Sequence, residues 1–363
     1  MSLIQEHSIQ IRVDLPQKDV SAQMDVFYNP IMVSNRNISI LLLNCLEKKE
    51  LKMADPLAGS GIRSLRFLKE LKKDKITHLF VNDMKETFPL VFAENLHLNH
   101  LSKDERVTVS AQDASVFLLS KIGFDYIDID PFGSPNPFLA AAIGRISREG
   151  ILAVTSTDTA ALTGTYPKAT LRKYWASSFK NYLMHELGLR ILIRKVQLQG
   201  VQFDKALVPI LSYHKDHYFR IYFCSFKGKE KCDELIQQLR YFLFCTQCLS
   251  FKTSTYNKEK CSCGKEFIFA GPLWVGKLFD AALIGKMAQE NPFPEEQKFL
   301  DILKEEAKID VVGFYDLHAL AHKLKKEPPK MEKALRTVKG VRTQFSLNGI
   351  KTKETLEKIK DLF

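Results

Sequence analysis

The sequence predicts a mixed α/β fold built on a largely parallel sheet, and two features of the chain support this prediction. Short apolar runs alternate with amphipathic segments through the first 230 residues, as they do when helices connect parallel strands. The alternation ends in two β-rich runs, Ala206–Tyr213 and His217–Phe226, separated by Lys215-Asp216, which predict an antiparallel hairpin. The length of 363 residues allows two or three domains, each with its own core.

The elements of the predicted sheet follow one another in order. Five short apolar runs are the candidate strands: Leu51–Ala54, His78–Asn82, Val107–Ala111, Asp125–Ile129 and Gly150–Thr155. The segments between them, such as Ile62–Lys72 and Phe88–His100, have apolar residues at helical spacing. A parallel sheet finished by a hairpin is typical of class I, Rossmann-like methyltransferases, and we expect that fold.

The chain after Lys227 predicts a smaller α+β domain. The expected helices are Lys231–Phe242, an apolar helix from Gly276, Glu295–Lys308, Asp316–Lys325, Lys330–Lys339 and one at the end of the chain, with short strands at Val341–Phe345 and Gly349–Thr352. Three helices followed by two strands predict a winged-helix-like part. We expect a main domain at 1–230, and the Pro-rich breaker at residues 290–295 predicts a further boundary near 291. A connecting, metal-binding region at 231–290 and a basic domain at 291–363 follow.

The charge of the chain favours a polyanionic partner. Lys and Arg outnumber Asp and Glu by 53 to 42, which gives a net charge of +11. Residues 323–363 alone hold twelve Lys or Arg and five Asp or Glu. This basic tail is interpreted either as a phosphate-contacting surface or as a solvated helical face.

Other sequence features exclude some classes of protein. The longest apolar runs, such as Ile38–Leu43, are far shorter than the ~18 residues that a membrane span needs. The first residues lack the basic and apolar regions of a secretory signal. An odd count of seven cysteines, four of them clustered, fits a reducing compartment better than a disulfide framework. We therefore expect a cytoplasmic protein that makes no use of a membrane.

Acidic residues follow four successive candidate strands. They are Asp55, Asp83, Asp113 and Asp130, and ligands of such sheets bind beyond the carboxyl ends of the strands. The first runs into a turn in which Gly59 and Gly61 allow the backbone to approach a ligand closely. Asp83 is placed to accept hydrogen bonds from ribose hydroxyls, and Asp113 to meet an adenine amino group.

This series favours S-adenosylmethionine as the ligand. A nicotinamide dinucleotide is the alternative, but Ser64 stands where the third Gly of its G-x-G-x-x-G motif should be. That alternative also leaves the two further acids unexplained.

Asp130-Pro131-Phe132-Gly133 follows the fourth strand and resembles the motif of enzymes that methylate an exocyclic amine of a base. Such a nitrogen is a poor nucleophile, because its lone pair is delocalised into the ring. The Asp130 carboxylate and the Pro131 carbonyl can each accept one N–H, and the carboxylate can stabilise the positive charge that develops on nitrogen. Phe132 offers a face for stacking an extruded base. The alternative is a simple Pro-Gly turn.

At these residues the chain resembles a known family, the tRNA guanine-26 N2-dimethyltransferases. The resemblance covers nearly the whole chain in order. Its matching segments are Val26–Pro30, Asn35–Asn37, Gly61–Arg63, Asp130–Pro135, Thr157–Thr159, Gly164–Pro167, Arg172–Tyr174, His185–Arg190, Asp216–Arg220 and Gly271–Trp274.

The resemblance implies an enzyme that transfers methyl groups from S-adenosylmethionine to N2 of guanosine in tRNA, at position 26, giving N2-methyl- and N2,N2-dimethylguanosine. The N-terminal segment 1–50 would cover the cofactor site, with Arg36 in contact with the methionine carboxylate of the cofactor. Asp130, with Pro131 and Phe132, would be catalytic. The other expected cofactor-binding residues are Phe27, Asp55, Gly59, Arg63, Asp83, Asp113 and Ala114. The sequence departs from the family at Asn37, where an acid is common, and at the turn with two glycines.

Four cysteines predict a structural zinc site. Cys245-x2-Cys248 and Cys261-x-Cys263 form two close pairs separated by twelve residues, and four thiolates suit tetrahedral zinc. The second pair is one residue tighter than the usual knuckle, so unmetallated thiols and an iron–sulfur cluster are alternatives.

Three other functions remain open from the sequence. One is an amino-methyltransferase that acts on a different RNA, and another is one that acts on DNA. The third is a non-catalytic RNA-binding protein on a methyltransferase scaffold, against which the intact Asp130 motif argues. The tRNA is the expected partner, and no obligate protein partner is inferred.

Overall fold

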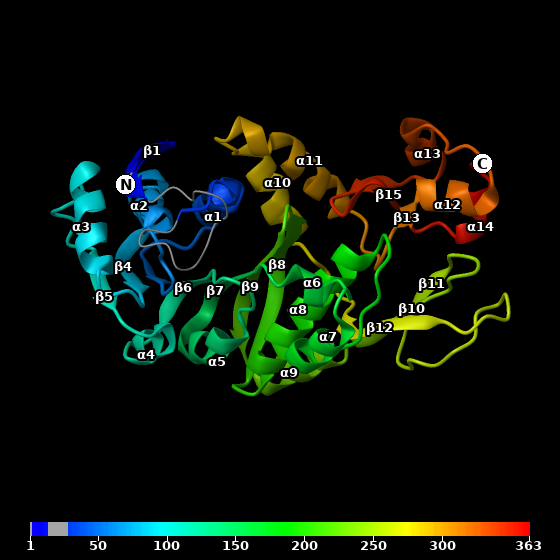
Figure 1. Ribbon diagram of the computed structural model, residues 1–363, viewed down its shortest axis with the longest axis horizontal. Helices are drawn as coiled ribbons and strands as arrows, with labels where there is room; N and C mark the ends of the chain where they lie inside the picture. The colour runs from blue at the N-terminus through cyan, green and yellow to red at the C-terminus, as the bar shows by residue number, and fades with distance from the viewer. Residues whose placement is uncertain (1, 14–27) are drawn as a thin grey trace. The chain divides into compact units, whose positions relative to one another are not determined.

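The computed structural model describes residues 2–13 and 28–363. Figure 1 labels the helices and strands. The chain divides into two compact units. The first unit comprises residues 1–157, 222–227 and 289–296, and the second comprises 158–221, 228–288 and 297–363. Phe27, one of the predicted cofactor-binding residues, lies outside the described residues.

The main sheet confirms the predicted fold class. It has seven strands in the order β5-β4-β3-β6-β7-β9-β8. The strand pairs that join β5, β4, β3, β6 and β7 are all parallel. The strands are β3 (Leu51–Asp55), β4 (Ile76–Asp83), β5 (Val107–Ala111), β6 (Phe124–Ile129), β7 (Ile146–Ser156), β8 (Lys205–Lys215) and β9 (Tyr218–Lys227).

Helices connect the parallel strands, as the alternation in the sequence predicts. The central strands β3 and β6 are buried along almost their whole length, because helices cover both faces of such a sheet. The helices of the first unit are α1 (Val33–Cys45), α2 (Ile62–Glu70), α3 (Phe88–Leu98), α4 (Ala114–Leu119) and α5 (Asn136–Arg145), with a short 3₁₀ turn η1 (Pro30–Met32) before α1 and a second, η2 (Pro294–Glu296).

An N-terminal hairpin, β1 (Ser2–Glu6) and β2 (Ile9–Val13), was not predicted from the sequence. Its alternating residues Ile9, Ile11 and Val13 are fully buried. The side chains of Asn95 and Asn99 accept hydrogen bonds of 2.9 Å from the backbone of β2. These asparagines take the place of a neighbouring strand, so a two-stranded ribbon is stable here.

The second unit begins with α6 (Thr159–Leu162), α7 (Pro167–Tyr174) and the long helix α8 (Met184–Val201). It continues with α9 (Lys229–Ile236) and a three-stranded sheet in the order β11-β10-β12. Its strands are β10 (Leu239–Phe244), β11 (Phe251–Ser254) and β12 (Ile268–Trp274).

One predicted helix, Lys231–Phe242, is wrong in its second half. The helix ends at Ile236, and the aromatic run that starts at Leu239 is strand β10. β10 pairs on both sides, with β11 and with β12, and the buried rings of Phe242 and Phe244 pack against Phe251 and Phe179. These tertiary contacts override the helical appearance of the segment.

The end of the chain is largely helical and has a core of its own. It contains α10 (Ala281–Gln289), α11 (Gln297–Glu306), β13 (Tyr315–Asp316), α12 (Leu317–Leu324), α13 (Met331–Thr337), β14 (Val341–Thr343), β15 (Ser346–Lys351) and α14 (Leu356–Lys360). The three strands form a sheet in the order β13-β15-β14. Leu320, Val338, Ile350 and Ile359 belong to the buried cluster beneath them. The winged-helix-like assignment of this region stays a prediction.

A buried charge cluster joins three elements of the second unit. Lys351 Nζ lies 3.0 Å from Glu186 Oε1 and 3.2 Å from Glu306 Oε1, and Arg190 Nε donates to Glu186 Oε1 at 2.9 Å. All four side chains are almost completely buried. Lys351 is one of the twelve cations of the basic tail, so this cation belongs to the core and does not face solvent.

Among residues 2–13 and 28–363, no helix is both long and apolar enough to cross a membrane.

Candidate functional site

A cavity of about 360 Å³ opens in the first unit at the carboxyl ends of β3, β4 and β6. Three of the four acids that follow the strands line it, and the fourth does not. The predicted site residues in its wall are Arg36, Asp55, Gly59, Arg63, Asp83, Asp130, Pro131 and Phe132.

The turn after β3 is held against the end of β4. The Gly59 N–H donates to Asp83 Oδ2 at 2.8 Å, and the Asn82 side chain donates to the Pro56 carbonyl at 3.0 Å. Gly61 has a φ of +76°, and a Cβ there would lie 2.2 Å from the ring of Phe92. Only glycine fits this position, because any side chain would collide with Phe92. The glycine therefore allows the tight turn that lines the cavity.

Asp55 is a buried carboxyl in the wall of the cavity. It accepts a hydrogen bond of 2.8 Å from the Ser64 hydroxyl. Burial raises the pKa of Asp55 to about 7, and the nearby carboxylates Asp128 and Asp130 add to the rise, while Arg63 opposes it. This part of the cavity wall therefore changes its charge near neutral pH.

The raised pKa of Asp55 predicts a pH effect on stability. Between the ordinary pKa of about 4 and the raised value, the folded state binds a proton that the unfolded state lacks, so stability falls as pH rises. From pH 5 to pH 8, the free energy of unfolding of the unchanged protein should fall by about 2 to 3 kcal/mol relative to that of Asp55→Asn, at 1.36 kcal/mol per pKa unit. Urea unfolding of both proteins at each pH measures this difference. Parallel stability curves for the two would contradict the assignment.

Arg63, in the first turn of α2, organises the side of the cavity that holds Asp130. Its guanidinium donates to Asn35 Oδ1 at 2.9 Å and to Ser39 Oγ at 3.0 Å. It also pairs with Asp130 and lies 3.3 Å from Asp128. Because its own side chain is buried, Arg63 fixes the orientation of Asp130 at the cavity.

The turn after β6 presents an aromatic ring. Phe132 is 50% exposed and lies in the wall of the cavity. Gly133 anchors the turn, since its N–H donates to Thr157 Oγ1 at 2.7 Å and its carbonyl accepts from the Thr157 N–H at 3.0 Å. A planar group could stack on this ring beside Asp130.

Arg36 makes a contact that the sequence did not predict. It pairs with the buried carboxylate of Glu6 at 2.5 Å, and Arg66 contacts the same carboxylate at 2.9 Å. Burial raises the pKa of Glu6, but the two arginines and Tyr28 more than offset this, so its pKa is lowered. Glu6 comes from the unpredicted hairpin, so no local pattern could indicate this partner.

Two predicted cofactor residues, Asp113 and Ala114, do not line the cavity. The Asp113 carboxylate caps α4 and accepts from the N–H groups of Ser115 and Val116 at 2.9 and 3.0 Å. Ala114 is buried in the first turn of that helix. Their roles toward a cofactor remain predictions.

Several lining residues were not assigned a role from the sequence. Met84 and Lys85 follow Asp83 directly, and Thr157 follows β7. Their positions next to strand ends are the signal that could have identified them.

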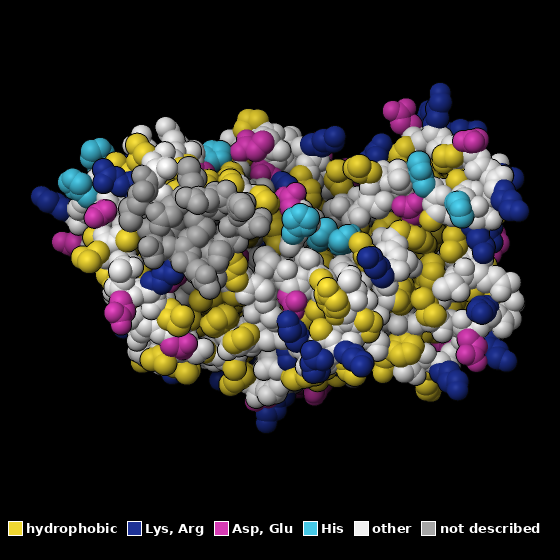
Figure 2. All heavy atoms as spheres, in the orientation of Figure 1, with side chains coloured by type: hydrophobic (Ala, Val, Ile, Leu, Met, Phe, Trp, Pro, Cys, Tyr) yellow, Lys and Arg dark blue, Asp and Glu magenta, His cyan; other side chains and the backbone are white. Residues whose placement is uncertain are grey.

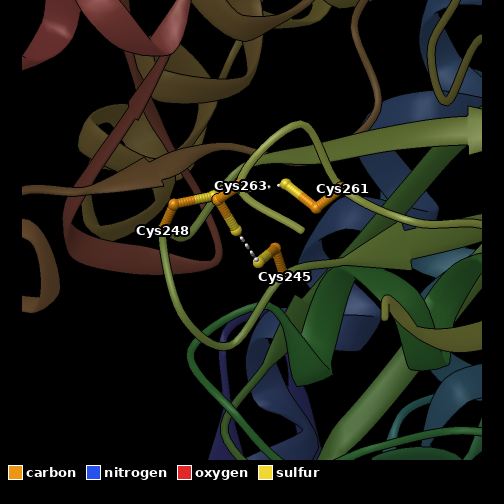
Figure 3. Close-up of side chains that lie close together, drawn as sticks. All are labelled: Cys245, Cys248, Cys261 and Cys263. Carbon is orange, nitrogen blue, oxygen red and sulfur yellow. Dashed lines mark hydrogen bonds between the residues drawn. The ribbon is translucent and has the colours of Figure 1, made fainter. Parts of the chain in front are cut away.

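The four clustered cysteines converge, as the metal prediction requires. Their sulfur atoms all lie within 4.8 Å of one another (Figure 3). The Cys245 and Cys263 sulfurs are 3.5 Å apart, and those of Cys248 and Cys261 are 3.4 Å apart. A tetrahedral zinc ion with Zn–S bonds of about 2.3 Å needs sulfurs roughly 3.8 Å apart. The tight second pair therefore does not prevent the geometry that zinc requires.

The structure is similar to a solved structure described as a complex of Trm1 from Pyrococcus horikoshii with S-adenosyl-L-methionine. The TM-score is 0.86 at 31% identity, over 100% of this chain and 99% of the other. The fold and the cavity define a class I methyltransferase that depends on S-adenosylmethionine.

The sequence comparisons show the family. The profile of the N2,N2-dimethylguanosine tRNA methyltransferase family matches residues 7–363, so the chain belongs to that family. A tRNA (guanine(26)-N(2)/guanine(27)-N(2))-dimethyltransferase of Aquifex aeolicus is 40% identical over 99% of this chain and 95% of its own length. A tRNA (guanine(26)-N(2))-dimethyltransferase of Methanobrevibacter smithii is 38% identical over 97% of this chain and 94% of its own.

Proposed function

We propose that this protein transfers one or two methyl groups from S-adenosylmethionine to N2 of guanosine 26 in tRNA. The observation that carries the proposal is Asp130-Pro131-Phe132 in the wall of the cavity that also holds Asp55 and Asp83. A base amine placed at this motif would lie beside the cofactor site. We place the reaction in the cytoplasm.

The chain's own residues account for the binding of the cofactor. Asp83 is oriented by the Gly59 N–H and by the Lys85 N–H, which donates to Oδ1 at 3.2 Å. A carboxylate held in this way can accept both ribose hydroxyls. Arg36 lies in the same wall and is the candidate for the methionine carboxylate, although Glu6 already neutralises part of its charge.

The target amine would be activated by Asp130 and the Pro131 carbonyl. S-adenosylmethionine, when bound, supplies an electrophilic methyl group. Asp130 accepts one N–H of the amine, stabilises the positive charge that develops on nitrogen, and can then take the proton. Phe132 holds the plane of the base by stacking. Because the buried guanidinium of Arg63 pairs with Asp130, the Asp130 carboxylate keeps this orientation through the transfer.

Product analysis tests the proposal. Unmodified tRNA is incubated with labelled S-adenosylmethionine, digested, and its methylated nucleosides are identified. We expect N2-methyl- and N2,N2-dimethylguanosine, and their loss when guanosine 26 is replaced by adenosine. Because one relative is named for positions 26 and 27, a guanosine 27 replacement is tested alongside. Methylation of another base, or of DNA alone, would contradict the proposal.

The Asp83 assignment makes a separate prediction. Asp83→Ala should raise the dissociation constant of S-adenosylmethionine at least about tenfold, because hydrogen bonds that involve a charged group contribute roughly 1.5 to 3 kcal/mol. Calorimetry measures this constant directly. Asp104→Ala removes a carboxylate that pairs with Arg106, does not line the cavity and serves as the matched control. Equal affinity in both variants would show that Asp83 is not the ribose ligand.

The four cysteines are proposed to bind a structural zinc ion. Their donor set of four sulfurs within 4.8 Å of one another supports this, and a metal held by four protein ligands has no open position for catalysis. We expect one zinc ion per chain by elemental analysis of unchelated protein. Cys245→Ser should lose the ion and lower the thermal stability, whereas Cys224→Ser, outside the cluster, should keep it. Protein without zinc, or a variant that retains it, would contradict the site.

The division into 1–230, 231–290 and 291–363 is kept as a proposal, with tRNA binding by the basic C-terminal domain. Lys and Arg on its surface support this, but acidic side chains lie among them (Figure 2). Lys351 and the buried cluster of this domain belong to the core of the second unit, so deleting the domain would disturb that core. Its role in tRNA binding is therefore tested by substituting its exposed Lys and Arg residues in the full chain.

A further inference from the structure

Helix α7 of the second unit has an exposed face with an unusual composition. Lys168, Leu171 and Arg172 lie at i, i+3 and i+4 of the helix, Trp175 is the residue that directly follows it, and all four are exposed. Leu171 is 60% exposed and Trp175 46%. The opposite side of the helix supplies the core with the buried Thr170 and Tyr174. An amphipathic helix normally buries its apolar stripe, so this face carries more exposed apolar surface than packing requires.

The segment that carries this face has charges of a single sign. From Thr159 to Lys180 the chain has four Lys or Arg and no Asp or Glu. Asp158, the nearest acid in the sequence, is engaged by Lys173 and Tyr174, both at 2.9 Å. In Figure 2, Lys and Arg side chains gather beside hydrophobic ones where Figure 1 has α7.

Trp175 is held in place by two basic side chains of α8. Arg194 Nη1 donates to the Trp175 carbonyl at 3.1 Å, and Lys195 Nζ lies 3.1 Å from the centre of the indole ring. Lys195 is almost completely buried, so one face of the ring is covered by a cation while about half of the side chain stays exposed. The ring is thereby fixed for a planar partner on its open side.

We propose that Lys168, Leu171, Arg172 and Trp175 form a docking surface for single-stranded RNA of the tRNA substrate. An unpaired base stacks on Trp175, and Lys168 and Arg172, one helical turn apart, contact backbone phosphates. Aromatic and basic side chains on one face are the combination that unpaired nucleotides need. Because the chain belongs to a family of tRNA methyltransferases, RNA is favoured as the occupant over an acidic protein or a membrane surface. The inference rests on the proposed tRNA substrate and adds a binding surface distinct from the basic tail.

The charge part of the surface is tested on the full chain by the salt dependence of tRNA binding. Lys168→Glu/Arg172→Glu should weaken binding and reduce the slope of log affinity against log salt by about 1.4 units, which is the loss of two phosphate contacts to a single strand at about 0.7 each. Lys298→Glu/Lys304→Glu is the matched control, because it reverses two exposed cations of α11 that have the acid Asp301 between them. A slope equal to that of this control would overturn the proposal.

The stacking part is tested by exchanging the ring alone. Trp175→Leu should weaken tRNA binding on the order of 5- to 100-fold with an unchanged salt slope, and Trp175→Phe should retain most of the affinity. Equal affinity of Trp175→Leu and the unchanged protein would overturn the stacking role. S-adenosylmethionine binding by each variant confirms that the chain is folded. If the unchanged protein neither binds nor methylates tRNA, the proposed function itself fails, whereas loss confined to the α7 variants supports this surface.

Discussion

Asp130→Ala is expected to reduce methyl transfer at least about 100-fold, the lower end of what a positioned acid–base group contributes. The Asp130 carboxylate contacts the amine of the base, whereas other residues bind the ribose and adenine of the cofactor. Binding of S-adenosylmethionine should therefore be unchanged. Single-turnover transfer at saturating cofactor and tRNA measures the chemical step directly.

Two further variants make the Asp130 test sharper. Asp130→Asn keeps an oxygen acceptor but not the negative charge, so its rate should lie between those of the alanine variant and the unchanged protein. Asp104→Ala removes an acid that pairs with Arg106 outside the cavity, and it should leave the chemical step intact. Near-normal turnover of Asp130→Ala would remove Asp130 from the mechanism.

Lys351→Met is expected to destabilise the protein by about 3 to 5 kcal/mol, because removing one partner of a buried ion pair leaves an uncompensated charge. Glu186 and Glu306 are both buried, and they would face each other without the cation between them. Chemical denaturation measures the loss. Lys353→Met removes an exposed cation two residues along the chain and should cost almost nothing.

The loss in Lys351→Met should depend on pH. Burial raises the pKa of Glu306 even in the unchanged protein, although Lys351 opposes this rise. Burial also pushes up the pKa of Glu186, but Lys351 and Arg190 leave it lowered. Without Lys351 both pKa values rise, so the folded state binds more protons than the unfolded state above about pH 4, and stability falls as pH rises. The deficit should be smaller at pH 5 than at pH 8, and Glu306→Gln in the same chain should recover part of it. A deficit independent of pH would contradict the assignment.

The sequence by itself determined the parallel sheet and most of the cofactor cavity. Strand periodicity locates β3, β4 and β6, and the carboxyl ends of parallel strands meet at one edge of a sheet. The acids Asp55, Asp83 and Asp130 therefore had to lie near one another once the strands were assigned. The paired spacing of Cys245, Cys248, Cys261 and Cys263 indicated a metal site in the same way, because each pair is a local feature.

Only the tertiary structure decided which partner each charged group has. Arg36 pairs with Glu6, thirty residues away in a hairpin that the sequence did not reveal, and Lys351 pairs with Glu186 across 165 positions. The strand character of Leu239–Phe244 also depends on its two neighbours, β11 and β12. Local periodicity records which side of an element is apolar. Local periodicity does not predict which distant side chains an element contacts, because those contacts depend on how the elements pack.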